Sequence, residues 1–278
     1  MKNTLINMAT VSFVAMGLQG CQQKDGFYEK VTPGSEVLGP EFSLIPPVDN
    51  NPAPGPLCEQ GSSASVICNP LGGGDTTPPL NPSGRNGLIA FLYEGDPQWN
   101  NIDRYSDDGY KHPETIYFSN FNVPTRAFDE GFGFSATEFL KNKNDEKLIE
   151  WFAIFAKGNL KLPADESEGF YHIATLSDDG IRISVDGNMI INNPNTHAPT
   201  INCAGQLVSM HHSEEKPFEL GYFQGPRFHI ALMTFVKKID DPGSFNGGAH
   251  CSGSNVQVLI DDGYEVMAAD WFTLPAGY

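Results

Sequence analysis

The chain has 278 residues, of which 17 are basic and 34 are acidic, so its formal net charge is −17. An acidic surface attracts cations and disfavours nucleic acid, which requires a basic footprint. Charged residues make up only 18% of the chain, which excludes a disordered protein of the highly charged kind. The abundance of Gly (29), Pro (21) and Phe (19) favours an all-β fold with many turns.

Residues 1–20 have the layout of a secretory signal peptide. A basic start is followed by an apolar stretch, residues 5–18, that is shorter than the ~20 residues needed to span a bilayer. The stretch ends in Leu18-Gln19-Gly20-Cys21, which resembles the bacterial lipobox. That resemblance implies cleavage before Cys21 and acylation of this residue, so we expect a lipid-anchored protein of the bacterial cell envelope. An ordinary secretory signal is the alternative.

The residue after Cys21 is Gln22 rather than Asp, which by analogy with the enterobacterial sorting pattern favours the outer membrane. Several acyl chains anchor a protein stably, because each buried CH₂ contributes ~0.8 kcal/mol. We therefore expect contact with the membrane through the lipid anchor only. Residues 21–84 are rich in Pro, Gly, Ser, Asn and Thr, and such a segment buries too little apolar surface to fold. They are predicted to form a linker.

Export places the remaining four cysteines in an oxidising compartment, where they are expected to form disulfides. Four cysteines allow three connectivities. We favour Cys58–Cys68, which closes a short loop in a stretch with little else to hold it, and Cys203–Cys251, which links two long loops. A zinc site is not expected, because the sequence contains no C-x-x-C pair.

Residues 85–278 are predicted to form one globular domain with a sizeable core. Residues 96–115 are expected to be a surface excursion, and Ser135 is a plausible N-cap of a short helix. Residues 192–205 and 240–248 are expected to be loops. Strands are predicted at residues 88–93, 116–118, 148–156, 168–176, 181–185, 188–193, 217–223, 227–236, 256–260 and 270–274.

The most informative stretch is residues 168–193, which alternates between apolar and polar side chains on either side of Ser177-Asp178-Asp179-Gly180. This pattern predicts a strand, an acidic turn, a second strand, a tight turn at Asp186-Gly187 and a third strand. Asp178 and Asp179 are expected to lie at the tip of a β-hairpin. Adjacent carboxylates repel one another unless solvent or a cation lies between them.

Residues 176–187 resemble the signature of the protective-antigen fourteen-kilodalton (PA14) domain, which also occurs in yeast flocculins, in adhesins and as an insert in some glycosidases. Residues 218–226, which contain Tyr222-Phe223-Gln224-Gly225, are similar to a second motif of that family, in the expected order. The resemblance covers roughly residues 85–278. It implies an antiparallel β-sandwich and, in the lectin-like members, calcium-assisted sugar binding.

In the flocculin-like members an Asp-Asp pair joined by a cis peptide ligates calcium at the mouth of the sugar site. By resemblance, Asp178 and Asp179 are the candidate calcium and ligand-binding residues here. Calcium takes six to eight oxygens, so we nominate Asn246 as a further ligand, because its loop follows the strand expected to lie beside the motif. The alternative is a plain turn, since Asp-Asp-Gly occurs three times in the chain.

Four aromatic residues, Tyr93, Trp99, Tyr105 and Tyr110, are candidates for a sugar-stacking surface, with core packing as the alternative, above all for Tyr93. The His211-His212-x-Glu214 spacing fits no standard metal motif, and a solvated turn is the simpler interpretation. No hydrolase or phosphate-loop motif is present, so we predict a binding module and not an enzyme.

The expected partner is a glycan or polysaccharide, with calcium as the cofactor. A structural envelope lipoprotein that binds another envelope protein without sugar is the second hypothesis, and a polysaccharide hydrolase is the third. No nucleic acid is expected as a partner.

Overall fold

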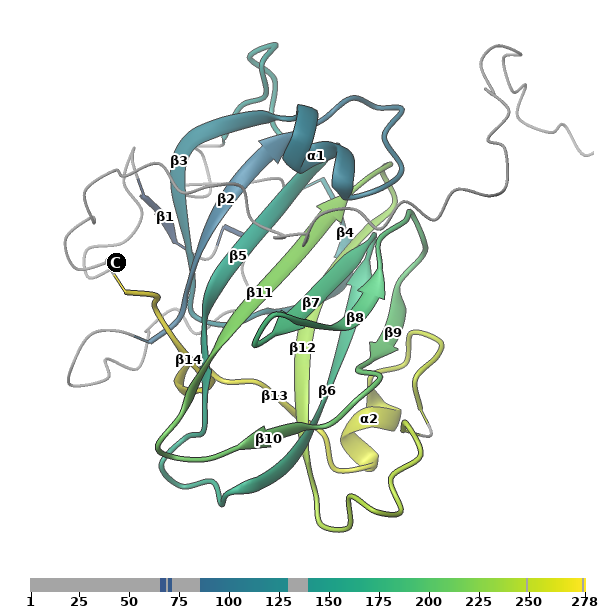
Figure 1. The fold of residues 1–278 in the computed structure, drawn as a ribbon. Coiled ribbons are helices and arrows are strands. Elements are labelled where there is room, and N and C mark those ends of the chain that lie inside the picture. Colours follow the sequence, from purple (N-terminus) through teal and green to yellow (C-terminus); the bar gives the residue numbers. More distant parts are fainter. Residues whose placement is uncertain (1–65, 69, 72–85, 130–139, 249, 277) are drawn as a thin grey trace, which may run out of the picture. The chain divides into compact units, whose positions relative to one another are not determined.

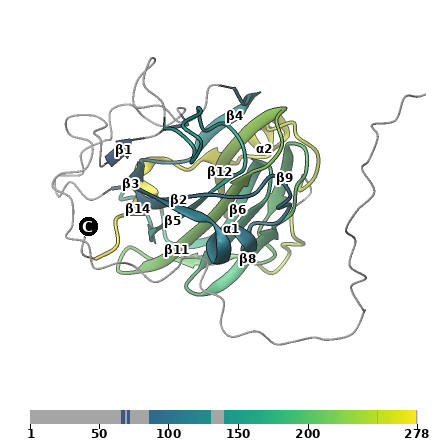
Figure 2. The same cartoon turned by 90° about the horizontal axis from the view of Figure 1, so that it is seen from above.

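The computed structural model describes residues 66–68, 70–71, 86–129, 140–248, 250–276 and 278, which form two facing β-sheets (Figure 1, Figure 2). The prediction of an all-β fold with an antiparallel β-sandwich is confirmed. The predicted signal peptide, most of the predicted linker and the predicted N-cap Ser135 lie outside the described residues. No helix in the described parts of the chain is long and apolar enough to cross a membrane.

The first sheet has eight strands, all antiparallel except for the parallel pair β1–β3. Its order is β1 (Val66–Cys68), β3 (Tyr110–Phe118), β2 (Leu88–Glu94), β5 (Phe152–Lys161), β11 (Glu215–Gln224), β7 (Ile181–Val185) and β8 (Asn188–Asn193), with β14 (Phe272–Thr273) paired to β5.

The second sheet has six strands, whose pairs are all antiparallel. Its order is β10 (Val208–Met210), β6 (Gly169–Asp178), β12 (His229–Ile239) and β13 (Glu265–Val266), with β4 (Asn122–Ala127) paired to β12 and β9 (Thr200–Cys203) paired to β6. Two short α-helices, α1 (Asp103–Asp108) and α2 (Gln257–Asp261), and the 3-10 turn η1 (Ala269–Trp271) lie outside the sheets.

The central strands are buried on both faces, which explains why their apolar runs are almost continuous. In β6, Tyr171 and Ile173 point into the main core between the sheets, whereas Ala174 and Leu176 pack outward against Leu259 of α2. The first sheet is covered in the same way by the chain around α1. A fully buried apolar side chain contributes ~1.5–3 kcal/mol, so both covers are part of the stabilising core.

The structure corrects several predictions, among them the loop expected at 192–205, which contains β9. Residues 256–260 are not a strand, because Leu259 is buried on the turn of helix α2 while Ile260 is 42% exposed. The predicted excursion at 96–115 contains α1 and the first part of β3. Part of the predicted linker belongs to the sandwich, since β1 pairs with β3 and Leu71 is 1% exposed in the core.

The predicted disulfide Cys203–Cys251 is present, with an S–S distance of 2.00 Å. It ties β9 to the chain that leads into α2. Cys68 is disulfide-bonded as well, and its predicted partner Cys58 lies outside the described residues.

Candidate functional site

Asp178 and Asp179 lie where the chain passes from one sheet to the other. Asp178 is the last residue of β6 in the second sheet, and Gly180 leads directly into β7 in the first. The hairpin expected from the sequence is therefore wrong, although the turn itself is present. The peptide bond between the two residues is cis, as the resemblance implied. Their exposed fractions are only 5% and 2%, so this acidic pair is buried.

The Asp179 carboxylate is held by backbone donors from two other loops. The His197 N–H donates to Oδ1 at 3.0 Å, and the Gly225 N–H donates to Oδ2 at 2.7 Å. Gly225 favours this close approach, because a Cβ there would lie 3.0 Å from the Asp179 Oδ2, a tight contact. These bonds stabilise the ionised form of Asp179, but burial outweighs them and its pKa is raised.

Asp178 differs from its neighbour, because no donor from any described residue reaches its carboxylate. The Tyr222 hydroxyl donates instead to the Asp178 backbone oxygen, at 2.6 Å. Burial, and then the negative charge of Asp179, raise the pKa of Asp178 from 3.8 to about 7. A largely buried carboxylate without a protein donor is costly when ionised, which favours its protonation or its neutralisation by a cation.

Gly180 explains the third position of the motif. A Cβ on this residue would lie 2.4 Å from the Phe223 ring and 2.7 Å from the Pro194 carbonyl oxygen. The backbone N–H of Phe223 donates to the Gly180 carbonyl at 3.0 Å, and the N–H of Asp179 donates to the Phe223 carbonyl at 3.2 Å. Only glycine allows β11 to approach the turn this closely.

An aromatic cluster lies beside the acidic pair. The ring of Trp99 packs edge-on against Tyr105 with centroids 5.3 Å apart, and Tyr105 lies 5.5 Å from Phe223. Burial and the charge of Asp179 raise the pKa of Tyr105. Tyr93 and Tyr105 are core residues, as the alternative interpretation held, whereas Trp99 is partly exposed.

Sequence reasoning missed Phe228, which is 77% exposed. It lies in the 225–228 loop between β11 and β12, three residues beyond the Gly225 N–H that binds Asp179. Tyr110, the fourth aromatic candidate, is 52% exposed at the start of β3, and its ring packs against His112 with centroids 5.0 Å apart. The antiparallel pairing of β6 with β12 was the signal that could have located Phe228, because it brings the start of β12 to the end of β6.

The structure does not bring Asn246 to the acidic pair. Asn246 lines a pocket with Ile239, and Ile239 pairs with Phe170 near the start of β6, eight residues before Asp178. At ~3.3 Å per residue this is the opposite end of the strand. The loop that carries Asn246 does follow β12, the strand beside β6. Because β12 runs antiparallel to β6, its last residue lies near the start of β6, and the loop is at the end of the sheet opposite to Asp178.

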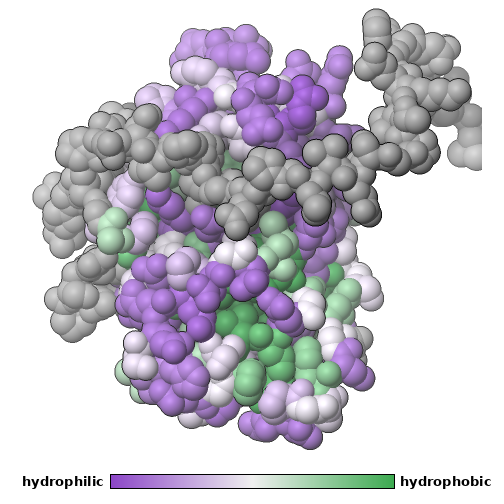
Figure 3. All heavy atoms as spheres, in the orientation of Figure 1, coloured by the Kyte–Doolittle hydropathy of each residue, from purple (hydrophilic) through white to green (hydrophobic). Residues whose placement is uncertain are grey.

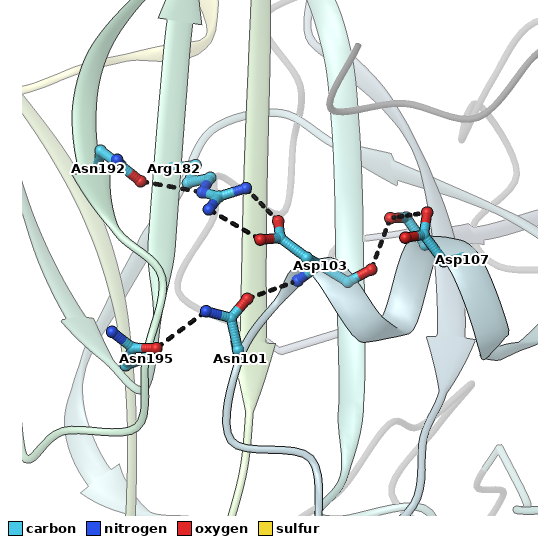
Figure 4. A network of polar contacts seen from close by, with 7 residues as sticks. Asn101, Asp103, Asp107, Arg182, Asn192 and Asn195 are labelled. Carbon is cyan, nitrogen blue, oxygen red and sulfur yellow. Dashed lines mark hydrogen bonds and ion pairs between the residues drawn. The ribbon is translucent and has the colours of Figure 1, made fainter. Parts of the chain in front are cut away.

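A polar network fixes α1 next to β7 (Figure 4). Arg182 of β7 donates from both terminal nitrogens to Asp103, with Nη2 3.0 Å from Oδ2, and its Nε donates to Asn192 at 2.9 Å. Asn101 donates to Asn195 at 2.9 Å. These bonds connect the segment that carries Trp99 and Tyr105 to the chain that leads into the His197 loop.

We expect Asp103→Ala to lower the free energy of unfolding by about 1–3 kcal/mol, because it removes the carboxylate from Arg182, whose side chain is only 12% exposed. The matched control is Asp108→Ala on the same helix, which breaks a pair with Arg104 that is more than half exposed and should cost less than about 1 kcal/mol. Urea unfolding measures both. Equal losses would contradict a fixing role for Asp103.

The His211-His212 turn forms no converging metal site. Glu168 accepts from the His212 N–H at 3.0 Å and lies 3.4 Å from the His211 Nδ1. Across the described residues, no three His, Cys, Asp or Glu side chains converge as a metal site formed by them alone requires. A cation at the acidic pair would therefore take its other oxygens from backbone groups, amides, water or ligand.

No protein-family model matches the sequence, and no curated protein matches it. Several solved structures are similar in part, including the following three. A PA14 sugar-binding domain from an RTX adhesin is 16% identical with a TM-score of 0.46, over 69% of this chain and 99% of that chain. The epithelial adhesin 6 A domain from Candida glabrata, in complex with Galβ1-3GlcNAc, is 15% identical with a TM-score of 0.37, over 61% of this chain and 92% of that chain.

The third match is an anti-sigma factor domain-containing protein, 14% identical with a TM-score of 0.43. The match covers 70% of this chain and 49% of that chain, so this chain spans about half the length of that protein. At these identities and TM-scores, the functional proposal rests on the geometry of the site itself.

Proposed function

We propose that this protein is a binding module that recognises glycans with the help of a calcium ion held by Asp178 and Asp179. The observation that carries the proposal is a pair of adjacent buried carboxylates, one of which has no hydrogen-bond donor from the described residues. A hard divalent cation neutralises both, and calcium prefers carboxylate and carbonyl oxygens. Its remaining coordination positions are open to sugar hydroxyls, as the sequence resemblance to the PA14 domain implies.

The surroundings of the pair suit a carbohydrate. Trp99 on one side is partly exposed, and Phe228 in the 225–228 loop is 77% exposed, so each offers an apolar ring. The molecule is mainly hydrophilic at this end, where α1 lies (Figure 3). Aromatic rings combined with a small number of well-placed polar groups are usual in sites that bind small ligands.

The test is binding to a printed array of neutral glycans, with calcium at about 1 mM, the range typical of extracellular calcium modules. Binding should disappear when calcium is chelated, and Phe228→Ala should weaken it about 3- to 10-fold, in line with the loss of one aromatic contact. Phe170→Ala is the control, since Phe170 is 42% exposed but lies at the opposite end of β6. Calcium-independent binding would contradict the calcium role, and a blank array together with capture of an envelope protein would favour the alternative, a protein-binding lipoprotein.

We further propose that Cys21 carries a lipid anchor, which would place this module on a bacterial envelope, with the outer membrane as the expected location. The support is the lipobox-like run before Cys21. Metabolic labelling with a fatty acid, lost in Cys21→Ser, tests this independently of glycan binding.

A further inference from the structure

Two asparagines in the chain are followed directly by glycine, in the pairs Asn86-Gly87 and Asn246-Gly247. The side-chain amide of an asparagine can react with the backbone nitrogen of the next residue and close a five-membered ring. Glycine in that next position leaves the nitrogen accessible, because it has no side chain. Since the dipeptide is the same at both places, any difference in reactivity between them comes from the fold.

The Asn246-Gly247 pair is exposed to solvent in the loop between β12 and α2. Neither the side-chain amide of Asn246 nor the N–H of Gly247 has a hydrogen-bond partner among the described residues. A Cβ placed on Gly247 would meet nothing within 4 Å, so the space around its nitrogen is open. The two groups that would react are therefore both accessible.

The residues on either side of the pair hold this loop in place. The ring of Phe245 packs against His172, with centroids 4.6 Å apart. On the other side, Gly248 lies so close to the disulfide that a Cβ on it would be 2.9 Å from the Cys251 Sγ, and that disulfide connects the segment to Cys203 of β9. The reactive pair is thus an exposed apex between two anchored neighbours.

The Asn86-Gly87 pair has the opposite surroundings. Asn86 is 7% exposed, and its Oδ1 accepts from the Lys161 Nζ at 3.1 Å. The Gly87 N–H donates to the Phe272 carbonyl at 3.2 Å, and a Cβ on Gly87 would lie 2.6 Å from the Tyr117 ring. A buried and hydrogen-bonded group of this kind reacts only when the structure opens locally.

We propose that Asn246 is a site of spontaneous covalent modification in the folded protein, by deamidation, and that Asn86 is protected from it. The Gly247 nitrogen loses its proton and attacks the Asn246 Cγ. The new C–N bond forms, ammonia leaves, and a cyclic imide results. Water then opens the imide at one of its two carbonyls, which gives aspartate or isoaspartate. The net reaction consumes a water molecule and replaces the amide by a carboxylate.

Deamidation changes a pocket at this end of the molecule, which has a volume of about 360 Å³ and is lined in part by Asn246. Two basic and three acidic residues also line it: Lys237, Lys238, Asp240, Asp241 and Asp262. A further carboxylate makes this pocket more acidic, and isoaspartate also lengthens the backbone between the anchored neighbours of the pair. The acidic pair at the other end of β6 is left as it is.

The test is incubation of the folded full chain at mildly alkaline pH, where more of the Gly247 nitrogen is deprotonated. Peptide mapping by mass spectrometry should show conversion of amide to acid at Asn246 and none at Asn86. Ion exchange should show a more acidic form that elutes with Asn246→Asp. Asn246→Gln should abolish this form, because glutamine closes the larger ring far more slowly. Asn188→Gln, at an exposed asparagine followed by methionine, is the matched control and should change nothing.

Incubation in urea separates the effect of the fold from that of the dipeptide. In the unfolded chain both asparagines should react, at similar rates. The inference is overturned if Asn246 stays intact in the folded protein, if Asn86 reacts there as fast as Asn246, or if unfolding leaves Asn86 unreactive. Neither calcium nor a glycan takes part in the experiment, so its outcome is independent of the proposed function.

Discussion

Calcium should raise the melting temperature of this protein by about 5–10 °C when its concentration exceeds the dissociation constant about 100-fold. Binding at that excess stabilises the folded state by ~2.7 kcal/mol, and for a domain of this size each kcal/mol shifts the midpoint by ~2–4 °C. The physical source is the neutralisation of two buried carboxylates, of which Asp178 has no donor from the described residues. Thermal unfolding followed by circular dichroism, with and without chelator, measures the shift.

Asp178→Asn should abolish the calcium shift. This variant is cleaner than Asp179→Asn, because the Asp179 carboxylate also accepts the His197 and Gly225 N–H groups and its loss would disturb two loops. The matched control is Asp261→Asn, which changes an exposed Asp-Asp-Gly turn of the same sequence. A calcium shift that survives in Asp178→Asn, or that is lost in Asp261→Asn, would place the ion elsewhere.

The sequence predicts most strands of this fold, because apolar alternation is a local property. It does not distinguish a hairpin from a turn that crosses between sheets. The stretch around Asp178-Asp179-Gly180 has the same local pattern in both cases, and only the pairing of β6 with β12 and of β7 with β11 separates them. Such pairing depends on contacts between residues far apart in the chain.

Only part of the candidate site can be predicted from the sequence, for the same reason. The acidic pair stands out in the sequence, whereas the groups around it come from loops at 194–197 and 225–228 through backbone N–H donors, which leave no residue-type signature. Asn246 was nominated because its strand was expected to lie beside the motif, without regard to the direction of that strand. If neighbouring strands are taken as antiparallel, the loop before β12, which carries Phe228, is the one that lies next to Asp178.

The short apolar run at residues 256–260 shows where periodicity fails. Val256, Val258 and Ile260 alternate as in a strand, but Val256, Leu259 and Ile260 also have helical i, i+3, i+4 spacing. A run this short fits both periods. The core decides between them, since only a helical turn directs Leu259 onto the outer face of β6 and β12.

In the absence of calcium, the free energy of unfolding of the wild type should fall relative to that of the Asp178→Asn variant as the pH rises from about 4 to about 7. The pKa of the Asp178 carboxyl is about 7 in the folded state, against an ordinary value of 3.8. Between these values the folded state holds a proton that the unfolded state has released, so unfolding becomes easier as the pH rises. Above about pH 7 both states are ionised and the difference levels off.

The comparison with Asp178→Asn removes this carboxyl together with its coupling to Asp179, while Asp179 itself is present in both proteins. His112 and His172 are buried with lowered pKa values and destabilise the protein toward acid, which is the opposite sign, but both proteins contain them. At pH 8 without calcium, Asp178→Asn should therefore be more stable than the wild type, by several kcal/mol at most. Calcium should reduce that difference by ~2.7 kcal/mol at 100-fold its dissociation constant and reverse the order at a larger excess, since only the wild type binds it.

Urea unfolding across pH 4–8, with chelator and then with calcium, gives both curves for each protein. Parallel pH curves for the two proteins would show that Asp178 is not the titrating group. Reversal of the stability order by calcium would show that Asp178 destabilises the calcium-free protein and stabilises the calcium-bound one. A residue that serves packing alone would not make stability depend on calcium in this way.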